Sequence, residues 1–197
     1  MRILTAVCLL CFAPNASAQR SDVAALQSRC LPRVPLTTLN AIIRVESGGN
    51  PNAMQIDFPR TLLKQWHLPE GTLRLKRQPT TEREALEWLE YFERRNISVD
   101  LGLMQVSTAE AHRRGFPAES LLDPCFNLRA GWQILDSAYQ LETKTYGPGQ
   151  EALQHAISRY NTGDTRHGID NGYLARVMAA LKQDPATTSM TRGGGRR

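Results

Sequence analysis

Apolar residues recur at intervals of three and four along most of the chain, and this pattern limits the fold more than any other feature of the sequence. Positions i, i+3, i+4 and i+7 lie on one face of a helix. The segments with this spacing are residues 23–30, 39–46, 85–92, 128–139, 153–160 and 173–181. We therefore predict a mainly α, single helical domain, with at most a short β element near residues 73–75.

The first 18 residues have the pattern of a cleaved secretory signal. They contain an early arginine, Arg2, an apolar run over residues 3–13 and a small-residue ending at residues 16–18. The run is too short to span a bilayer as a stable helix, so we expect no stable membrane span. The alternative is a buried N-terminal helix. We expect a signal peptide over residues 1–18 and a domain over residues 19–183.

The last residues, 184–197, are mostly Pro, Thr, Ser, Gly and Arg. We predict a disordered basic tail for them. The whole chain carries a net charge of +5, which suits an acidic partner such as a bacterial wall or a membrane surface. Because the sequence has no dense basic run with interleaved aromatics, we do not expect nucleic acid as a partner.

Two of the four cysteines would remain after removal of a signal peptide, namely Cys30 and Cys125. An oxidising compartment favours a disulfide between them, and two free buried cysteines are the alternative. The four histidines are scattered along the chain without the paired spacing of metal ligands. The sequence therefore predicts no metal and no cofactor.

A carboxylate interrupts the apolar stripe of residues 39–46. Leu39, Ile42 and Ile43 lead at helical spacing to Glu46, and a Ser-Gly-Gly-Asn-Pro segment follows it. Desolvation on an apolar face disfavours the ionised carboxyl and raises its pKa. A carboxyl that keeps its proton near neutral pH can act as a general acid. The alternative is a surface residue at a frayed helix end.

Four segments in this order resemble the lytic transglycosylases with a goose-type lysozyme fold. They are residues 46–51 (E-S-G-G-N-P), 102–106 (G-L-M-Q-V), 156–163 (A-I-S-R-Y-N-T-G) and 172–177 (G-Y-L-A-R-V). The resemblance covers roughly residues 36–181 and is closest to the small enzymes of conjugation and type IV secretion systems. Those enzymes also share residues 78–80 (Q-P-T), 100–102 (D-L-G) and 123–128 (D-P-C-F-N-L).

The resemblance implies a lysozyme-like fold with a substrate cleft and a periplasmic enzyme. Its activity would cleave the β-1,4 bond between N-acetylmuramic acid and N-acetylglucosamine in peptidoglycan. The products would be 1,6-anhydromuramyl ends, and the cut would open the wall for a secretion or conjugation apparatus. Needle and pilus systems use similar enzymes.

The same resemblance implies the site residues. Glu46 would be the catalytic acid and base, and no second carboxylate would be needed. The residues expected to bind or border the substrate are Ser47, Gly102, Met104, Gln105, Tyr160, Asn161 and Tyr173.

Each of these residues has an expected task. Gly102 would let the sugar pass close to the backbone, Met104 would form an apolar wall, and Gln105 would bond sugar hydroxyls or N-acetyl groups. For these three, a buried strand with a hydrogen-bonded Gln is the alternative.

Tyr160 would hydrogen-bond Glu46 or the leaving oxygen. Asn161 would bind the N-acetyl group or brace the cleft, Tyr173 would pack beside the cleft, and Ser47 is the nearest candidate to orient Glu46. A turn that ends a helix is the alternative for Tyr160 and Asn161.

Two other functions stay open. A hydrolase of the lysozyme type would need a second carboxylate to hold water, with Asp100 as the first candidate and Asp57 as the second. A glycan-binding assembly subunit of the secretion machinery is the other alternative. The long insertion between Glu46 and Gly102 carries a predicted helix over residues 82–95, which would wall the cleft or bind a partner.

Overall fold

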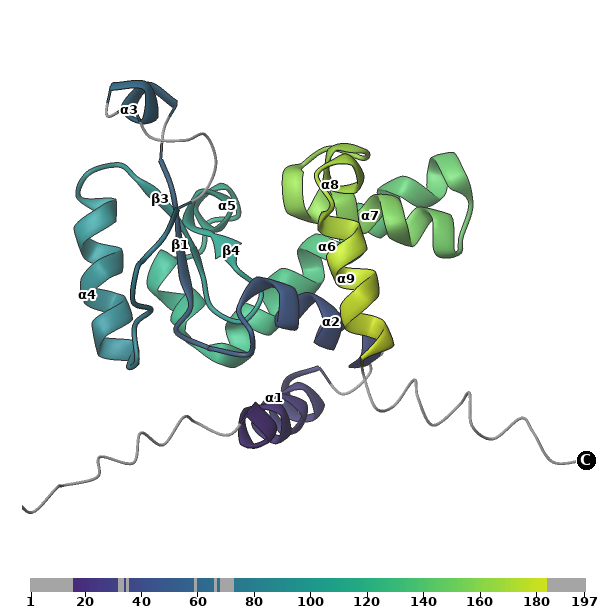
Figure 1. The fold of residues 1–197 in the computed structure, drawn as a ribbon, viewed down its shortest axis with the longest axis horizontal. Helices are drawn as coiled ribbons and strands as arrows, with labels where there is room; N and C mark the ends of the chain where they lie inside the picture. The colour runs from purple at the N-terminus through teal and green to yellow at the C-terminus, as the bar shows by residue number, and fades with distance from the viewer. Residues whose placement is uncertain are drawn as a thin grey trace, which may run out of the picture.

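The computed structural model describes residues 16–31, 34, 36–58, 60–65, 67 and 73–183, and most of them are helical (Figure 1). The predicted basic tail and most of the predicted signal peptide lie outside the described residues. The first helix, α1 (Ala16–Cys30), contains the predicted stripe over residues 23–30 and begins earlier in the chain. Among the described residues, none of the helices combines the length and apolarity needed to cross a membrane.

A helical body forms one side of the molecule. Its helices are α2 (Leu36–Glu46), α6 (Pro124–Tyr146), α7 (Gln150–Thr162), α8 (His167–Asp170) and α9 (Tyr173–Lys182). The long helix α6 packs along α7, and α2 packs against α9. Helices α2, α6, α7 and α9 match predicted apolar stripes, although α6 begins at Pro124, ahead of the predicted start after Asn127, and the short helix α8 was not predicted.

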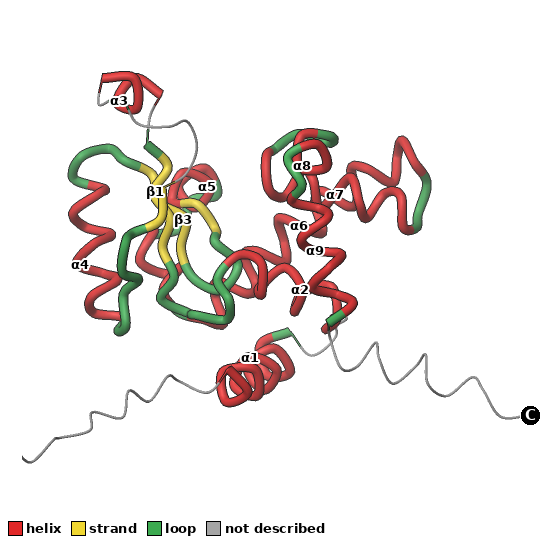
Figure 2. The backbone as a smooth tube through the Cα atoms, in the orientation of Figure 1, coloured by secondary structure: helices red, strands yellow, loops and turns green. Residues whose placement is uncertain are grey.

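A small antiparallel sheet lies beside this body, and Figure 2 shows its strands in yellow. Its strands are β1 (Met54–Asp57), β2 (Leu73–Arg74), β3 (Ser98–Leu101) and β4 (Val106–Ser107), in the order β2-β1-β3-β4. The predicted strand near residues 73–75 is confirmed as β2. The other three strands were not predicted, because two to four residues are too few to show the alternation of apolar and polar residues that marks a strand.

The remaining elements are α3 (Arg60–Gln65), α4 (Glu82–Glu93), α5 (Thr108–Arg113) and the 3₁₀ helix η1 (Ala118–Leu122). In Figure 1 the strands β1 and β3 lie between α4 on one side and the helical body on the other. Helix α4 begins as its sequence indicates, since the Thr81 hydroxyl accepts a hydrogen bond from the backbone N–H of Glu84.

The two faces of the sheet differ in polarity. Met54, Ile56, Val99 and Leu101 are buried, whereas the residues that alternate with them are polar. Register places Asp100 opposite both Gln55 and Ser107. Because alternate side chains point to opposite faces, these polar side chains share the face turned away from the core.

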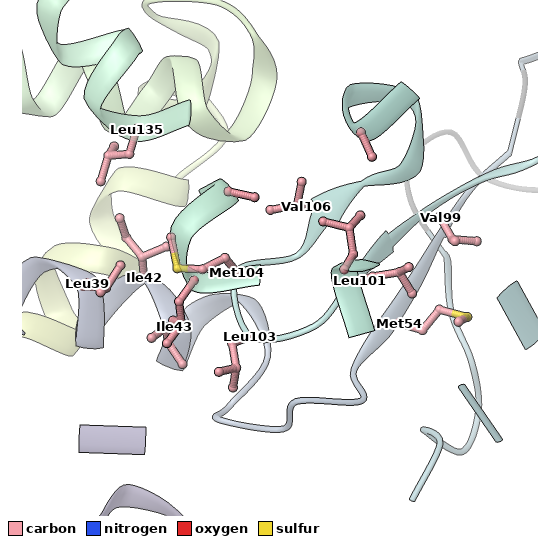
Figure 3. Close-up of a cluster of buried hydrophobic side chains, with 14 of the residues drawn as sticks. Leu39, Ile42, Ile43, Met54, Val99, Leu101, Leu103, Met104, Val106 and Leu135 are labelled. Carbon is pink, nitrogen blue, oxygen red and sulfur yellow. The ribbon is translucent and has the colours of Figure 1, made fainter. Parts of the chain in front are cut away.

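One continuous core joins the sheet to the helices. Figure 3 shows Leu39, Ile42 and Ile43 of α2 around Met104, with Leu135 of α6 nearby. Leu39, Ile42 and Met104 are fully buried. The apolar stripe of α2 therefore packs onto the turn between β3 and β4, and this contact sets the position of the end of α2.

The predicted disulfide is confirmed. Cys30 at the end of α1 is bonded to Cys125 at the start of α6, with 5.3 Å between their Cα atoms. The bond closes a loop of 95 residues, for which chain entropy gives a stabilisation of about 4–5 kcal/mol. It holds α1 against α6, the helix on which it packs.

Candidate active site

A cleft of about 570 Å³ opens between the polar face of the sheet and the helical body. Helices α2, α5, α7 and α9 contribute to its lining together with β1 and β3. Of the predicted site residues, Glu46, Gln105, Tyr160, Asn161 and Tyr173 line this cleft. Ser47, Gly102 and Met104 are not among its lining residues.

Glu46 is the last residue of α2 and is only 9% exposed. The three apolar residues before it on the stripe are buried, so the helix can present only its final turn to the cleft. Gly48 and Gly49, with φ of 64° and 88°, then end the helix. The carboxyl is thus largely shielded from water while it remains open to a ligand in the cleft.

Tyr173 is the hydrogen-bond donor to this carboxyl. Its hydroxyl donates to Oε1 of Glu46, and its side chain is 1% exposed. Burial, followed by the charge of Glu46, raises the pKa of Tyr173 well above its usual value. The phenol therefore stays protonated and fixes the position of Glu46. Tyr173 does more than pack beside the cleft as predicted.

Tyr160 uses its hydroxyl hydrogen within the protein, and its predicted bond to the leaving oxygen stays a prediction. Its hydroxyl donates to the carbonyl oxygen of Met104 at 2.5 Å, so its proton is not directed to Glu46. Burial, and then the charges of Glu46 and Asp100, raise the pKa of Tyr160 well above its usual value. Tyr160 therefore ties α7 to the turn between β3 and β4.

That turn, residues 102–105, explains why Gly102 and Met104 do not form the cleft wall. Gly102 has a φ of 77°, and a Cβ there would lie 2.4 Å from the side-chain nitrogen of Asn127. Met104 is fully buried and lies over Gly131 of α6. Neither residue lines the cleft, and backbone geometry and packing explain glycine and methionine at these positions, so their contact with the sugar stays a prediction.

Gln105 lines the cleft, but its amide is already engaged. Its Nε2 donates to the carbonyl oxygens of Ala53 at 2.9 Å and Gly102 at 2.8 Å. Its Oε1 accepts from Nε2 of Gln55 at 3.0 Å. Both amide hydrogens are therefore used within the protein, as in the alternative of a hydrogen-bonded Gln.

Ser47 connects the two chain segments of the site. Its hydroxyl lies 2.9 Å from the carbonyl oxygen of Leu103 and 3.1 Å from that of Ile43, and it accepts from the N–H of Gly49. Ser47 therefore positions the end of α2 through the backbone. The hydrogen bond that orients the Glu46 carboxyl comes from Tyr173.

Asn161 is exposed at the end of α7 and lines the cleft. Its Oδ1 accepts a hydrogen bond from Nδ2 of Asn171 at 3.1 Å, which leaves its own amide nitrogen available to a ligand. This geometry is compatible with both predicted tasks, binding an N-acetyl group and bracing the cleft.

The polar face of the sheet brings two further carboxyls into the cleft. Asp57 and Asp100 both line it together with Glu46. Burial, followed by the charges of Asp57 and Glu46, raises the pKa of Asp100 from 3.8 to about 7. Asp100 is therefore largely protonated in mildly acidic solution.

Asp100→Asn is expected to change the pH dependence of stability. Between about pH 4 and 7 the folded protein binds more protons at this site than the unfolded chain, so stability falls as pH rises. Below this range both states are protonated, and above it the loss is complete. In urea unfolding, the variant should have a higher free energy of unfolding than the wild type at pH 8 but not at pH 4. Equal gains at both pH values would contradict the assignment.

Tyr173→Phe is expected to lower kcat about tenfold with little change in KM, because it removes a hydrogen bond to the carboxyl but keeps the ring. The measurement is the pH profile of the glycan cleavage that the sequence resemblance implies, and this profile should change in the variant. Tyr160→Phe is the matched control, since its hydroxyl bonds a backbone carbonyl. A larger pH shift in the Tyr160 variant than in the Tyr173 variant would reverse the two roles.

Two further predictions concern the surroundings of the cleft. No residue of α4 lines it, so the prediction that the inserted helix walls the cleft is wrong for the site described here. Within the described ranges, no group of three His, Cys, Asp or Glu side chains is placed to hold a metal ion.

Comparison with known proteins gives one family and a set of relatives. The transglycosylase SLT domain matches residues 25–176. The chain is 32% identical to Protein virB1 of Agrobacterium fabrum over 154 residues, which cover 78% of this chain and 57% of that protein. It is 30% identical to the type IV secretion system protein virB1 of Brucella suis over 161 residues, or 79% and 62% of the two chains.

A third relative, Protein virB1 of Rhizobium radiobacter, is 29% identical over 178 residues, which cover 86% of this chain and 63% of the relative. The chain therefore spans about three fifths of the length of these curated relatives. No solved structure matches the chain significantly.

Proposed function

The chain belongs to the transglycosylase SLT family, and from this premise we propose that it is a peptidoglycan lytic transglycosylase. The reaction would cleave the β-1,4 bond between N-acetylmuramic acid and N-acetylglucosamine and leave 1,6-anhydromuramyl ends. The observation that supports it most is the carboxyl of Glu46, nine-tenths buried at the cleft and held by the Tyr173 hydroxyl.

In the proposed mechanism Glu46 acts twice. Its protonated carboxyl donates a proton to the glycosidic oxygen as the bond to the muramyl C1 breaks, and the substrate's N-acetyl carbonyl assists departure of the leaving sugar. The resulting carboxylate then accepts the proton of the muramyl 6-hydroxyl, whose oxygen bonds C1. No water is added, and Glu46 ends in the protonated state in which it began.

A hydrolytic muramidase is the second candidate, and Asp100 is the observation that favours it. Asp100 lines the same cleft as Glu46, close enough for the charge of Glu46 to raise its pKa. Its carboxylate would hold an attacking water on the sugar face opposite the acid. The protonated form that predominates below pH 7 is a weaker base, so this candidate predicts activity that rises towards alkaline pH.

Mass analysis of digested cell walls separates the two reactions. Anhydro ends, 18 mass units lighter than reducing ends, are expected from the wild type if C6 attack closes the ring. Reducing ends as the main product would contradict the transglycosylase and support the hydrolase. Binding to glycan chains without either product would support the assembly subunit.

The cellular role that we propose is local opening of the wall for a type IV secretion or conjugation apparatus, because the three relatives compared are all named virB1 and that of Brucella suis is named as a type IV secretion system protein. We also propose export to the periplasm by a signal peptide over residues 1–18. N-terminal sequencing of the exported protein tests this cleavage, and the expected first residue is Gln19.

A further inference from the structure

The cleft contains an arginine that the proposed reaction does not use. Arg159 lines it from α7, next to Tyr160 in the chain. Its Nε donates to Oε1 of Glu142 at 2.6 Å, and its Nη1 donates to the carbonyl oxygen of Gly163 at 3.0 Å. The guanidinium is therefore held on two sides by the protein.

Glu142 is a rigid anchor for this guanidinium. It lies on α6, is only 3% exposed, and its second oxygen accepts the hydroxyl proton of Thr165 at 2.9 Å. Both carboxylate oxygens are thus satisfied, and the pair cannot move without breaking a buried network. Such an anchor orients Arg159 before any ligand arrives.

The remaining edge of the guanidinium is open. Nη2 of Arg159 has no hydrogen-bond partner among the residues that the structure describes, and the side chain is 30% exposed to solvent. Because an arginine presents donors in a fixed plane, an oriented edge of this kind suits a carboxylate.

The neighbouring charges support an anionic ligand group on this side of the cleft. Arg113 of α5 and Arg176 of α9 line the same cleft, and the guanidinium of Arg176 lies 5.6 Å from the centre of the Tyr173 ring. The carboxyls of Asp57 and Asp100 come from the sheet, and that of Glu46 comes from α2. Arg113 is ion-paired with Glu110, which also lines the cleft, and the N-acetylated amino sugars of a glycan backbone are neutral. The arginines that can meet an anionic ligand group are therefore Arg159, through its Nη2, and Arg176.

We propose that Arg159 is a specificity-determining residue that binds a carboxylate carried on the muramyl substituent of the glycan. This inference rests on the proposed function, since it assumes a peptidoglycan chain in the cleft. Two parts of peptidoglycan offer such a group: the peptide stem, through its own carboxylates, and the lactyl group of a muramyl residue whose stem has been removed.

Three preparations of the same glycan chains separate these sources. The first keeps its peptide stems, the second has all carboxylates capped as methylamides, and the third has been treated with an amidase that removes the stems and exposes lactyl carboxylates. The wild type should cleave the capped chains with a kcat/KM about tenfold lower than its preferred chains, mainly through KM. Preference for the first preparation assigns the stem, and preference for the third assigns the lactyl group.

Arg159→Gln should remove this preference and bring the three chains to similar kcat/KM values. Because it also leaves the buried Glu142 without its partner, Arg159→Lys is the second variant: it keeps a cation beside Glu142 but lacks Nη2. Arg129→Gln, on the exposed side of α6, is the matched control for loss of one positive charge and should keep the wild-type preference.

Two results would overturn the proposal. One is a wild type that cleaves capped and uncapped chains equally, and the other is an Arg159→Lys variant that keeps the full preference. The assay also separates this proposal from the proposed function. If the wild type releases no anhydro ends from any chain, the reaction is wrong, and calorimetric binding of the three chains still decides whether Arg159 recognises a carboxylate.

Discussion

Glu46→Gln is expected to lower kcat for release of anhydro muropeptides by about 10³-fold. Gln has nearly the same shape as Glu but can neither give a proton to the glycosidic oxygen nor accept one from the 6-hydroxyl. A single substitution therefore removes both proton transfers of the proposed mechanism. The measurement is the rate of formation of anhydro ends from purified glycan chains at saturating substrate.

The same variant should fold and bind as the wild type does. The Tyr173 hydroxyl can donate to the amide oxygen of Gln as it does to Oε1 of Glu46, so no buried donor loses its partner. We expect an unchanged melting temperature or a small increase, since a buried carboxyl is replaced by a neutral amide. Affinity for glycan chains should change less than threefold.

Glu110→Gln is the matched control, because Glu110 lines the same cleft but forms ion pairs with Arg113 and Arg114. It should keep most of the wild-type rate. An Glu46→Gln variant that retains a tenth or more of the wild-type kcat would remove Glu46 from the role of acid and base.

The longer helices and the position of Glu46 could be predicted from sequence because they depend on local information, whereas the short helices α3 and α8 and the 3₁₀ helix η1 were not predicted. A helix of eleven residues with a consistent apolar stripe, such as α2, establishes its own period, and the glycines after it mark its end. The disulfide could also be predicted, since only two cysteines remain once a signal segment is set aside. Such features need no knowledge of what packs against them.

The contacts within the site depend on tertiary structure, and the predictions for them were less accurate. Tyr160 and Tyr173 are both tyrosines near Glu46, and only the relative placement of α7 and α9 decides which hydroxyl reaches the carboxyl. The left-handed backbone of Gly102 and Gln105 likewise follows from how the turn meets α6. Sequence spacing carries no information about these directions.

The charged residues near the cleft also show which features depend on local sequence and which depend on tertiary structure. Glu142 lies within the polar positions of a helical segment, and nothing local distinguishes it from a solvated surface acid. It is buried because α6 packs along α7, and its partner Arg159 comes from that second helix. A buried carboxyl can be suspected from sequence only where its position falls on an apolar stripe, as it does at Glu46.

Asn127→Ala is expected to destabilise the fold by about 3 kcal/mol or more. Asn127 is fully buried in α6, and sequence reasoning placed it only as the residue before that helix. Its Oδ1 accepts from the N–H of Met104 at 2.8 Å, and its Nδ2 donates to the carbonyl oxygens of Leu101 at 2.8 Å and Leu121 at 3.0 Å. Alanine removes all three hydrogen bonds to the backbone, and the loss of a buried hydrogen-bond partner costs about 1–3 kcal/mol.

Asn127→Ala should lower kcat as well as stability. Urea unfolding measures the loss of stability and steady-state kinetics measure the loss of kcat, so the two effects can be separated. The turn that Asn127 holds supplies the carbonyl oxygens that receive the hydroxyls of Tyr160 and Ser47. A looser turn therefore loosens both α7 and the end of α2, so kcat should drop even at temperatures where the variant is folded. Gln133→Ala, at an exposed position of the same helix, should change neither quantity. If Asn127→Ala unfolds at the wild-type urea concentration, the amide does not hold the turn, and the support of the site must come from the packing of Met104 against Gly131 instead.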